Sequence, residues 1–94
     1  SSSYFVKQTM HLVQGRGYYV INFDATIMAD APKIAPHAKT MEENLAALMD
    51  TDTDNVNVKS TTLEGVGPIG RGEAIAAMAT ALILKKSPVG RDTP

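Results

Sequence analysis

Apolar residues recur at helical spacing at the start of the chain. Between Tyr4 and Gln14, one arc of a helical wheel holds Phe5, Val6, Thr9, Met10, Leu12 and Val13. The opposite arc holds Lys7, Gln8, His11 and Gln14. This pattern predicts an amphipathic helix. A serine among the first three residues would cap its start, and Gly15 or Gly17 would end it in a left-handed conformation.

From Tyr18 to Ala29 the period changes to two. One face carries Tyr19, Ile21, Phe23, Ala25, Ile27 and Ala29. The other face is polar, so the segment predicts a long, half-buried strand. Pro32 and Pro36 follow it. Because a proline restrains both itself and the residue before it, we expect the segment between them to be an ordered loop.

Helical spacing returns after Pro36, which suits a first helical position. Apolar side chains up to Asp50 stand at Ala38, Met41, Leu45, Leu48 and Met49. This predicts a second helix. A second strand is expected from Val56 to Thr62, because apolar and polar residues alternate there and its end is rich in hydroxyl groups. Polar strand ends of this kind are typical positions for a site.

The last part of the chain is rich first in glycine and then in apolar residues. Residues 63–70 are expected to form a glycine-rich loop, and Arg71 to Lys86 to form a third helix that is apolar on nearly every side. Residues 87–94 contain two prolines and mixed charges and are predicted to be a mobile tail. Residues 1–86 would then belong to a single domain.

The predicted order is helix, strand, helix, strand, helix, which is an α/β or α+β arrangement. Two strands do not form an independently stable sheet, because both keep an unpaired edge and too small a hydrophobic face. Packing alone therefore indicates an incomplete fold. We expect further strands from residues upstream of Ser1, from other subunits, or from both.

Composition narrows the function classes. Of the 94 residues, 44% are hydrophobic and 20% are charged, and the net charge is -1, so no positive field would attract a nucleic acid backbone. The absence of cysteine excludes disulfides and thiol chemistry. The longest apolar stretch, Ala74 to Leu84, is shorter than the ~20 residues that a membrane crossing needs. No targeting signal is visible, and the true N-terminus is expected upstream.

Two familiar motifs are incomplete. Asp50, Asp52 and Asp54 resemble the start of a calcium loop, but Asn55 and Thr61 stand where glycine and glutamate are needed, which favours a turn. The run from Gly65 to Gly70 matches a dinucleotide fingerprint, but the strand and acidic residue that should follow are missing. Its glycines are instead expected to expose backbone amides to an anion or a subunit contact.

Hydroxyl groups and one carboxylate gather at the end of the second predicted strand. Glu64 directly follows Ser60, Thr61, Thr62 and Leu63. Hydroxyl groups donate to phosphate oxygens, and Mg²⁺ prefers one or two protein carboxylates together with phosphate. Threonines are also ordinary strand residues, so spacing alone leaves both interpretations open. Lys33, fixed between prolines, is the best candidate among the nearby cations; His37 and Lys39 are equally well explained as surface charges.

Four segments together resemble the 2-C-methyl-D-erythritol 2,4-cyclodiphosphate synthases. They are residues 22–27 (NFDATI), 31–37 (APKIAPH), 57–64 (NVKSTTLE) and 70–76 (GRGEAIA). The segments occur in family order and at family spacing, and the resemblance spans Ser2 to Lys86. It implies a homotrimer with a chorismate-mutase-like fold and active sites between subunits.

The resemblance also implies a reaction of the non-mevalonate isoprenoid pathway. The substrate is 4-diphosphocytidyl-2-C-methyl-D-erythritol 2-phosphate, whose 2-phosphate oxygen attacks the β-phosphorus and releases CMP. The enzyme class is a phosphorus-oxygen lyase that uses Zn²⁺ together with Mg²⁺ or Mn²⁺. The implied location is cytoplasmic, or the plastid in a photosynthetic eukaryote. No nucleic acid or membrane partner is implied.

Family motifs assign roles to individual residues. The cytosine would lie among Ala29, Asp30, Ala31, Pro32, Lys33, Ile34 and Ala35. Substrate contacts would extend to Ser60, Thr61, Thr62, Leu63 and Arg71, with Thr61 and Thr62 holding phosphate oxygens. Thr62 would steady the transition state as the catalytic residue, and Glu64 would hold the second metal. Arg71 and Glu73 would lie near the threefold axis.

The sequence departs from the family in two respects. Pro68 stands where the family often has an aromatic residue facing an axial cavity. The family's zinc ligands, an Asp-x-His pair and a second His, belong to an N-terminal portion without a counterpart here, and neither His11 nor His37 matches them. The same portion would complete the sheet. The alternative is a truncated, non-catalytic trimeric module that at most binds a cytidine nucleotide.

Overall fold

The structure, a computed structural model, describes residues 2–87. Its helices are α1 (Ser2–Gly15), α2 (Ala38–Met49) and the single turn α3 (Gly67–Gly70). Its strands are β1 (Tyr18–Met28), β2 (Val56–Thr61) and β3 (Ala76–Lys85). Two 3-10 turns, Ala35–His37 and Thr53–Asn55, lead into α2 and β2. Apart from Ser87, the predicted mobile tail lies outside the described residues.

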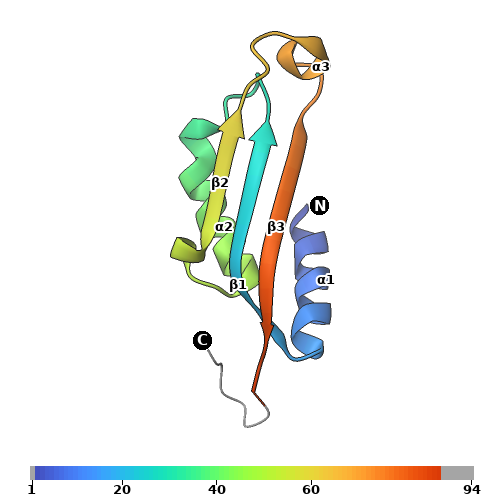
Figure 1. The fold of residues 1–94 in the computed structure, drawn as a ribbon, viewed down its shortest axis with the longest axis vertical. Helices are drawn as coiled ribbons and strands as arrows, with labels where there is room; N and C mark the ends of the chain where they lie inside the picture. The colour runs from blue at the N-terminus through green and yellow to red at the C-terminus, as the bar shows by residue number, and fades with distance from the viewer. Residues whose placement is uncertain (1, 88–94) are drawn as a thin grey trace.

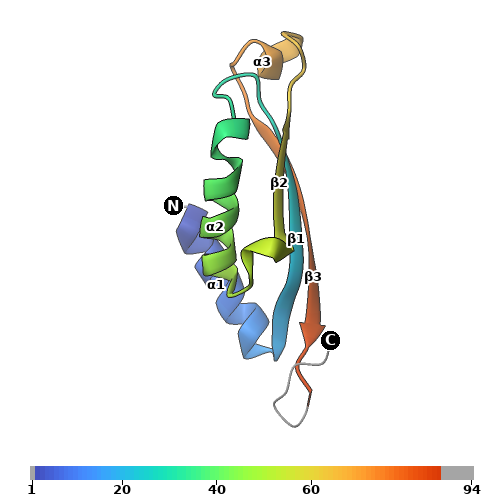
Figure 2. The same cartoon turned by 90° about the vertical axis from the view of Figure 1, so that its left-hand side faces the viewer.

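The three strands form one mixed sheet with β1 in the middle (Figure 1). β1 pairs in parallel with β2, from Phe23 opposite Val56 to Met28 opposite Thr61. β1 pairs antiparallel with β3 along its whole length. The parallel pair needs a long crossover, which α2 supplies. Both long helices lie on one face of the sheet and leave the other face open (Figure 2).

A small hydrophobic core fills the space between the helices and the sheet. Its buried members are Met10, Val20, Ala46, Met49 and Val56. Val6, Phe23 and Leu45 pack against them and are partly buried. Each of the two long helices therefore contributes its apolar face, as the helical spacing predicts. The fold is a mixed α+β arrangement, which confirms the expected class.

The predicted third helix is wrong. Residues 76–85 form β3, and α3 occupies only the glycine-rich segment before it. A continuous apolar run does not distinguish a helix from a strand by its period. Pairing with β1 favours the strand, because residues 76–85 form hydrogen bonds with backbone groups along an edge of β1 that would otherwise be unpaired. The described sheet thus has three strands, and the expectation of only two is corrected.

A bulge in β1 changes which side chains are buried. Val20 pairs with Ile83 and Asn22 pairs with Leu82, so Ile21 is an extra residue in the register. Such an insertion shifts the alternation by one position. Val20 is buried before the bulge, whereas Ala25 is buried after it. The prediction of a single uninterrupted face containing Tyr19 and Ile21 is therefore wrong for the first residues of β1.

A side chain of α2 binds the backbone of the edge strand β2. The Glu42 carboxylate accepts a hydrogen bond from the Val58 amide at 2.9 Å. On β3, the residues Met78 and Leu82 are 70% and 50% exposed. Completion of the sheet by further N-terminal strands stays a prediction. Within residues 2–87, the helices are too short or too polar to cross a bilayer.

Candidate functional site

The candidate site lies where the parallel strands β1 and β2 end (Figure 1). Their carboxyl ends meet at the same edge of the sheet, where open sheets commonly bind ligands. The amide of Ala29, the residue after β1, donates to the carbonyl of Thr61, the last residue of β2, at 3.0 Å. β1 then enters the loop of residues 29–36, and β2 enters the loop of residues 62–66.

A cleft of about 310 Å³ opens between these two loops. It is lined by Ala29, Asp30, Lys33, Ile34, Ala35, Pro36, Ser60 and Thr62. All but Pro36 are among the residues that the sequence predicts for the site. The volume lies at the lower end of the range for small-molecule sites, about 300–1,000 Å³. Two segments separated by some 25 residues along the chain thus line one cleft.

The remaining predicted residues do not line this cleft. They are Ala31, Pro32, Thr61, Leu63, Glu64 and Arg71. Side chains alternate along a strand, and because Ser60 lines the cleft, the side chain of Thr61 lies on the opposite, open face. Pro36, in contrast, lines the cleft although no role was predicted for it. The sequence feature that could have indicated this is its position directly after Ala35, the last residue of the predicted cytosine loop.

The side chain of Asp30 joins the two loops. Its carboxylate oxygens accept hydrogen bonds from the amides of Leu63 at 2.9 Å and Gly65 at 3.1 Å. The family motifs predict Asp30 in the cytosine loop but do not predict this connection. No local pattern reveals it, because the partners are backbone groups more than 30 positions away.

Glu64 stands between those two amides in a left-handed conformation, with φ of 51°. Glu64 is exposed to solvent. One accessible carboxylate suits Mg²⁺ or Mn²⁺, which keep several water ligands and share phosphate oxygens with a substrate. Zinc needs three or four protein ligands. Among residues 2–87, no three His, Cys, Asp or Glu side chains converge in this way, so the described residues alone do not form a zinc site, and Glu64 as a ligand of Mg²⁺ or Mn²⁺ stays a prediction.

Lys33 is the predicted cation that lines the cleft. It lines the cleft and is exposed to solvent, in a segment that begins with a cis peptide bond between Ala31 and Pro32. Arg71 is engaged elsewhere. Its guanidinium donates to the Glu73 carboxylate at 3.1 and 3.2 Å, and both side chains are more than half exposed. Of the two predicted cations, Lys33 lines the cleft and Arg71 does not.

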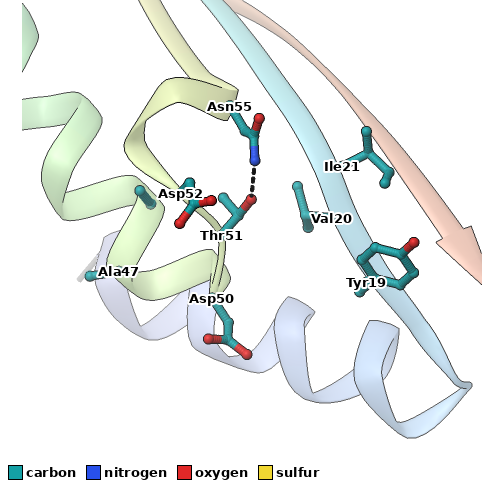
Figure 3. A pocket seen from close by; sticks show the side chains of 9 residues that line it. Tyr19, Val20, Ile21, Ala47, Asp50, Thr51, Asp52 and Asn55 are labelled. Carbon is teal, nitrogen blue, oxygen red and sulfur yellow. Dashed lines mark hydrogen bonds between the residues drawn. The ribbon is translucent and has the colours of Figure 1, made fainter. Parts of the chain in front are cut away.

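A larger cavity of about 510 Å³ lies at the other end of the sheet (Figure 3). It lies between the start of β1 and the turn that contains Asp50, Asp52 and Asn55. Asp50 has a φ of 54° and ends α2, and the Asn55 amide group donates to the Thr51 hydroxyl at 3.1 Å. The segment is a turn, as predicted.

Comparison with known proteins decides the family. A family model described as the YgbB family matches residues 1–84. The chain belongs to the YgbB family. YgbB relatives include 2-C-methyl-D-erythritol 2,4-cyclodiphosphate synthases from Alkaliphilus oremlandii, 49% identical over 80 residues, and Ectopseudomonas mendocina, 50% identical over 80 residues. These alignments cover 85% of this chain and 51% of each relative. The chain therefore spans about half the length of the curated relatives it matches.

Solved YgbB structures resemble the fold closely. The cyclodiphosphate synthase of Plasmodium vivax superposes with a TM-score of 0.88 at 30% identity, over 93% of this chain and 58% of that one. IspF of Plasmodium falciparum, described as a CDP complex, gives 0.86 at 29% identity, over 93% of this chain and 56% of that one. The resemblance inferred from the four sequence segments is thereby confirmed.

Proposed function

We propose that the complete protein is a 2-C-methyl-D-erythritol 2,4-cyclodiphosphate synthase of the non-mevalonate isoprenoid pathway. The observation that carries this proposal is the cleft between residues 29–36 and the hydroxyl groups of Ser60 and Thr62. Family membership supports it, and so does the description of one structural relative as a CDP complex.

The cleft suits the cytidine end of the substrate. Residues 29–36 supply small and apolar side chains together with backbone groups that read a base edge. Pro32 and Pro36 stiffen this segment, so little conformational entropy is lost on binding. Lys33 lies at the cleft and attracts the diphosphate. Thr61, Leu63 and Arg71 do not line this cleft, and their predicted substrate contacts stay predictions.

The chemistry is an intramolecular phosphoryl transfer. The 2-phosphate oxygen forms a bond to the β-phosphorus while the bond from that phosphorus to the oxygen shared with the α-phosphate breaks, and CMP leaves. Positioning and charge stabilisation supply most of the rate in such reactions. Ser60 and Thr62 hydroxyl groups donate to phosphate oxygens, with Thr62 in the predicted catalytic role.

Glu64 is the residue that would hold Mg²⁺ or Mn²⁺ in this chain. The chemistry that such an ion supplies when bound is neutralisation of diphosphate charge. Glu64 contributes one negatively charged ligand and leaves other coordination positions to water and phosphate. The described residues do not fit zinc, and we assign no step to it. A cytoplasmic location stays a prediction.

A trimer agrees with the surface of the described chain. Phe5 is 70% exposed, and Met78 and Leu82 on β3 are 70% and 50% exposed. Large apolar side chains gathered on one strand commonly mark an interface. We include the homotrimer, with the pair Arg71 and Glu73 near its axis, in the proposal.

Release of CMP tests the proposed function. The full-length protein, folded and loaded with zinc, is mixed with 4-diphosphocytidyl-2-C-methyl-D-erythritol 2-phosphate and Mg²⁺, and CMP is quantified by chromatography. We expect stoichiometric CMP and cyclic diphosphate. Absence of CMP would refute the proposed enzymatic activity. Intact-mass measurement identifies the alternative: a folded protein near 10.0 kDa would be the truncated module, and a substantially larger mass favours the enzyme.

A further inference from the structure

Two direct connections link the loops that form the cleft. One is the backbone bond from the Ala29 amide to the Thr61 carbonyl. The other is the pair of hydrogen bonds from the Leu63 and Gly65 amides to the two oxygens of Asp30, at 2.9 and 3.1 Å. Bonds to an ionised carboxylate are roughly twice as strong as bonds between neutral groups. Asp30 is thus the main side-chain link between the two loops.

The two amides lie on either side of Glu64. This glutamate has a φ of 51°, a left-handed conformation that residues with a Cβ rarely adopt. Such conformations persist where the surroundings hold them in place. The Asp30 carboxylate holds the residue before Glu64 and the residue after it, and so fixes the direction in which the Glu64 side chain leaves the backbone.

We propose that Asp30 is a positioning residue that holds Glu64 in place relative to the nucleotide cleft. Its backbone belongs to the cytosine loop, while its carboxylate belongs to the loop that carries the metal ligand. Movement of one loop is therefore transmitted to the other. The claim about metal and nucleotide rests on the proposed function, whereas the claim about the two amides does not.

This role differs from a substrate contact. Both carboxylate oxygens of Asp30 already accept backbone hydrogen bonds. A second carboxylate facing the diphosphate would repel it, but two amide donors offset the charge of Asp30. The substitution Asp30→Asn keeps the shape and replaces one acceptor with an NH₂ group, which faces an amide donor and does not accept from it.

Amide exchange in the full-length protein tests the contact itself. Asp30→Asn is compared with the wild type and with Asp52→Asn, an exposed aspartate at the opposite end of the sheet. We expect the amide of Leu63 or Gly65 to exchange about tenfold faster in Asp30→Asn, the effect of losing one bond to a charged group. Unchanged exchange at both amides would overturn the proposal. If Asp30→Asn does not fold, Asp30→Ser is measured in its place.

Calorimetric titration then separates positioning from general structure. CDP is titrated with and without Mn²⁺, and CMP is titrated without metal. We expect the gain in CDP affinity on adding Mn²⁺ to fall about 10- to 100-fold in Asp30→Asn, the usual cost of losing a group that orients a ligand. CMP affinity, measured without metal, should fall less than this metal-dependent gain, since CMP binding in that titration does not use the Glu64 site.

Equal Mn²⁺ dependence in Asp30→Asn and wild type would overturn the positioning role, as would a parallel loss of CMP affinity. A wild-type protein that binds no CDP would instead refute the proposed function. In that case the exchange rates at Leu63 and Gly65 still decide whether Asp30 orders the loop around Glu64.

Discussion

At the scale of single residues, Glu64 has a left-handed backbone and is exposed to solvent. An exposed carboxylate of this kind is suited to bind a cation. The amides of Leu63 and Gly65 on either side are bonded to Asp30, so the backbone at Glu64 is held in place before a metal binds. The residue itself is exposed and carries little of the hydrophobic packing. Function and stability should therefore respond differently to its replacement.

Glu64→Gln should lower turnover at limiting Mg²⁺ by at least about tenfold, since it removes the ligand charge and even outer-shell changes cost that much. Thermal unfolding should stay close to wild type. The matched control is Glu43→Gln, an exposed glutamate on α2. Wild-type turnover by Glu64→Gln at low Mg²⁺ would contradict the assignment.

Asp24 provides a pH-dependent contact on the open face. The Lys59 ammonium donates to its carboxylate at 2.9 Å and the Asn57 amide also at 2.9 Å, and these bonds hold the pKa of Asp24 below 3.8. A lowered pKa in the folded state contributes stability above the unfolded value, and that stability is lost as the pH falls through the folded value. The effect is small, because the pair is half exposed.

Asp24→Asn should therefore be slightly less stable than the wild type near neutral pH, and the difference should disappear well below pH 3.8. Urea denaturation of both proteins at the two pH values measures this. Asp54→Asn, on an exposed turn, serves as the control. A difference that is constant across the two pH values would exclude the titration of Asp24 as its cause.

At the scale of elements, the short helix α3 depends on close backbone contact. A Cβ atom added at Gly70 would overlap the backbone of Gly65. No flexible side chain lies there to move aside, so the backbone itself would shift. The loop that carries Glu64 and the turn that leads into β3 are therefore packed directly on each other.

Gly70→Ala should destabilise the protein by about 1–3 kcal/mol, the usual cost of overpacking. Gly15→Ala is the control, because nothing lies within 4 Å of its added Cβ and a helical alanine stabilises by about 0.5–1 kcal/mol over glycine. Denaturant unfolding measures both. Equal stability of Gly70→Ala and wild type would show that the two loops are not in contact in solution.

The elements also show which parts of the fold the sequence could predict. The first two helices and the first two strands match their predicted ranges to within one or two residues, because their periods of 3.6 and 2 are clear. β3 could not be predicted, since the run from Ala74 to Leu84 is apolar at nearly every position. The Ile21 bulge depends on pairing with β3 and has no local signal.

At the scale of the whole molecule, the family resemblance predicts that residues 29–35 and 60–64 contribute to one site. Most of those residues line the cleft, and their roles in binding stay predictions. The direction of the Thr61 side chain and the link through Asp30 could not be predicted, because both depend on contacts between distant segments. Short motifs likewise do not reveal which residues lie on the open face of the sheet.

The proposed trimer makes a further test possible. Met78 lies on β3 opposite Thr26 and is 70% exposed in the single chain. Met78→Lys would bury an unpaired charge in an assembly through this face, which costs several kcal/mol. Sedimentation should show the full-length variant shifted from trimer towards monomer. Gln8→Lys on the polar face of α1 is the control, and an unchanged trimer in Met78→Lys would place the interface elsewhere.

The hydrogen bond between Glu42 and Val58 affects which edge of the sheet is available for pairing with a further strand. Because a helix side chain already occupies an outward amide of β2, an incoming strand would have to displace a carboxylate on that side. β3 presents its outer backbone groups without such a cap among residues 2–87. Any added strand should therefore join beyond β3, so that the cleft between residues 29–36 and β2 stays at the far border of the enlarged sheet.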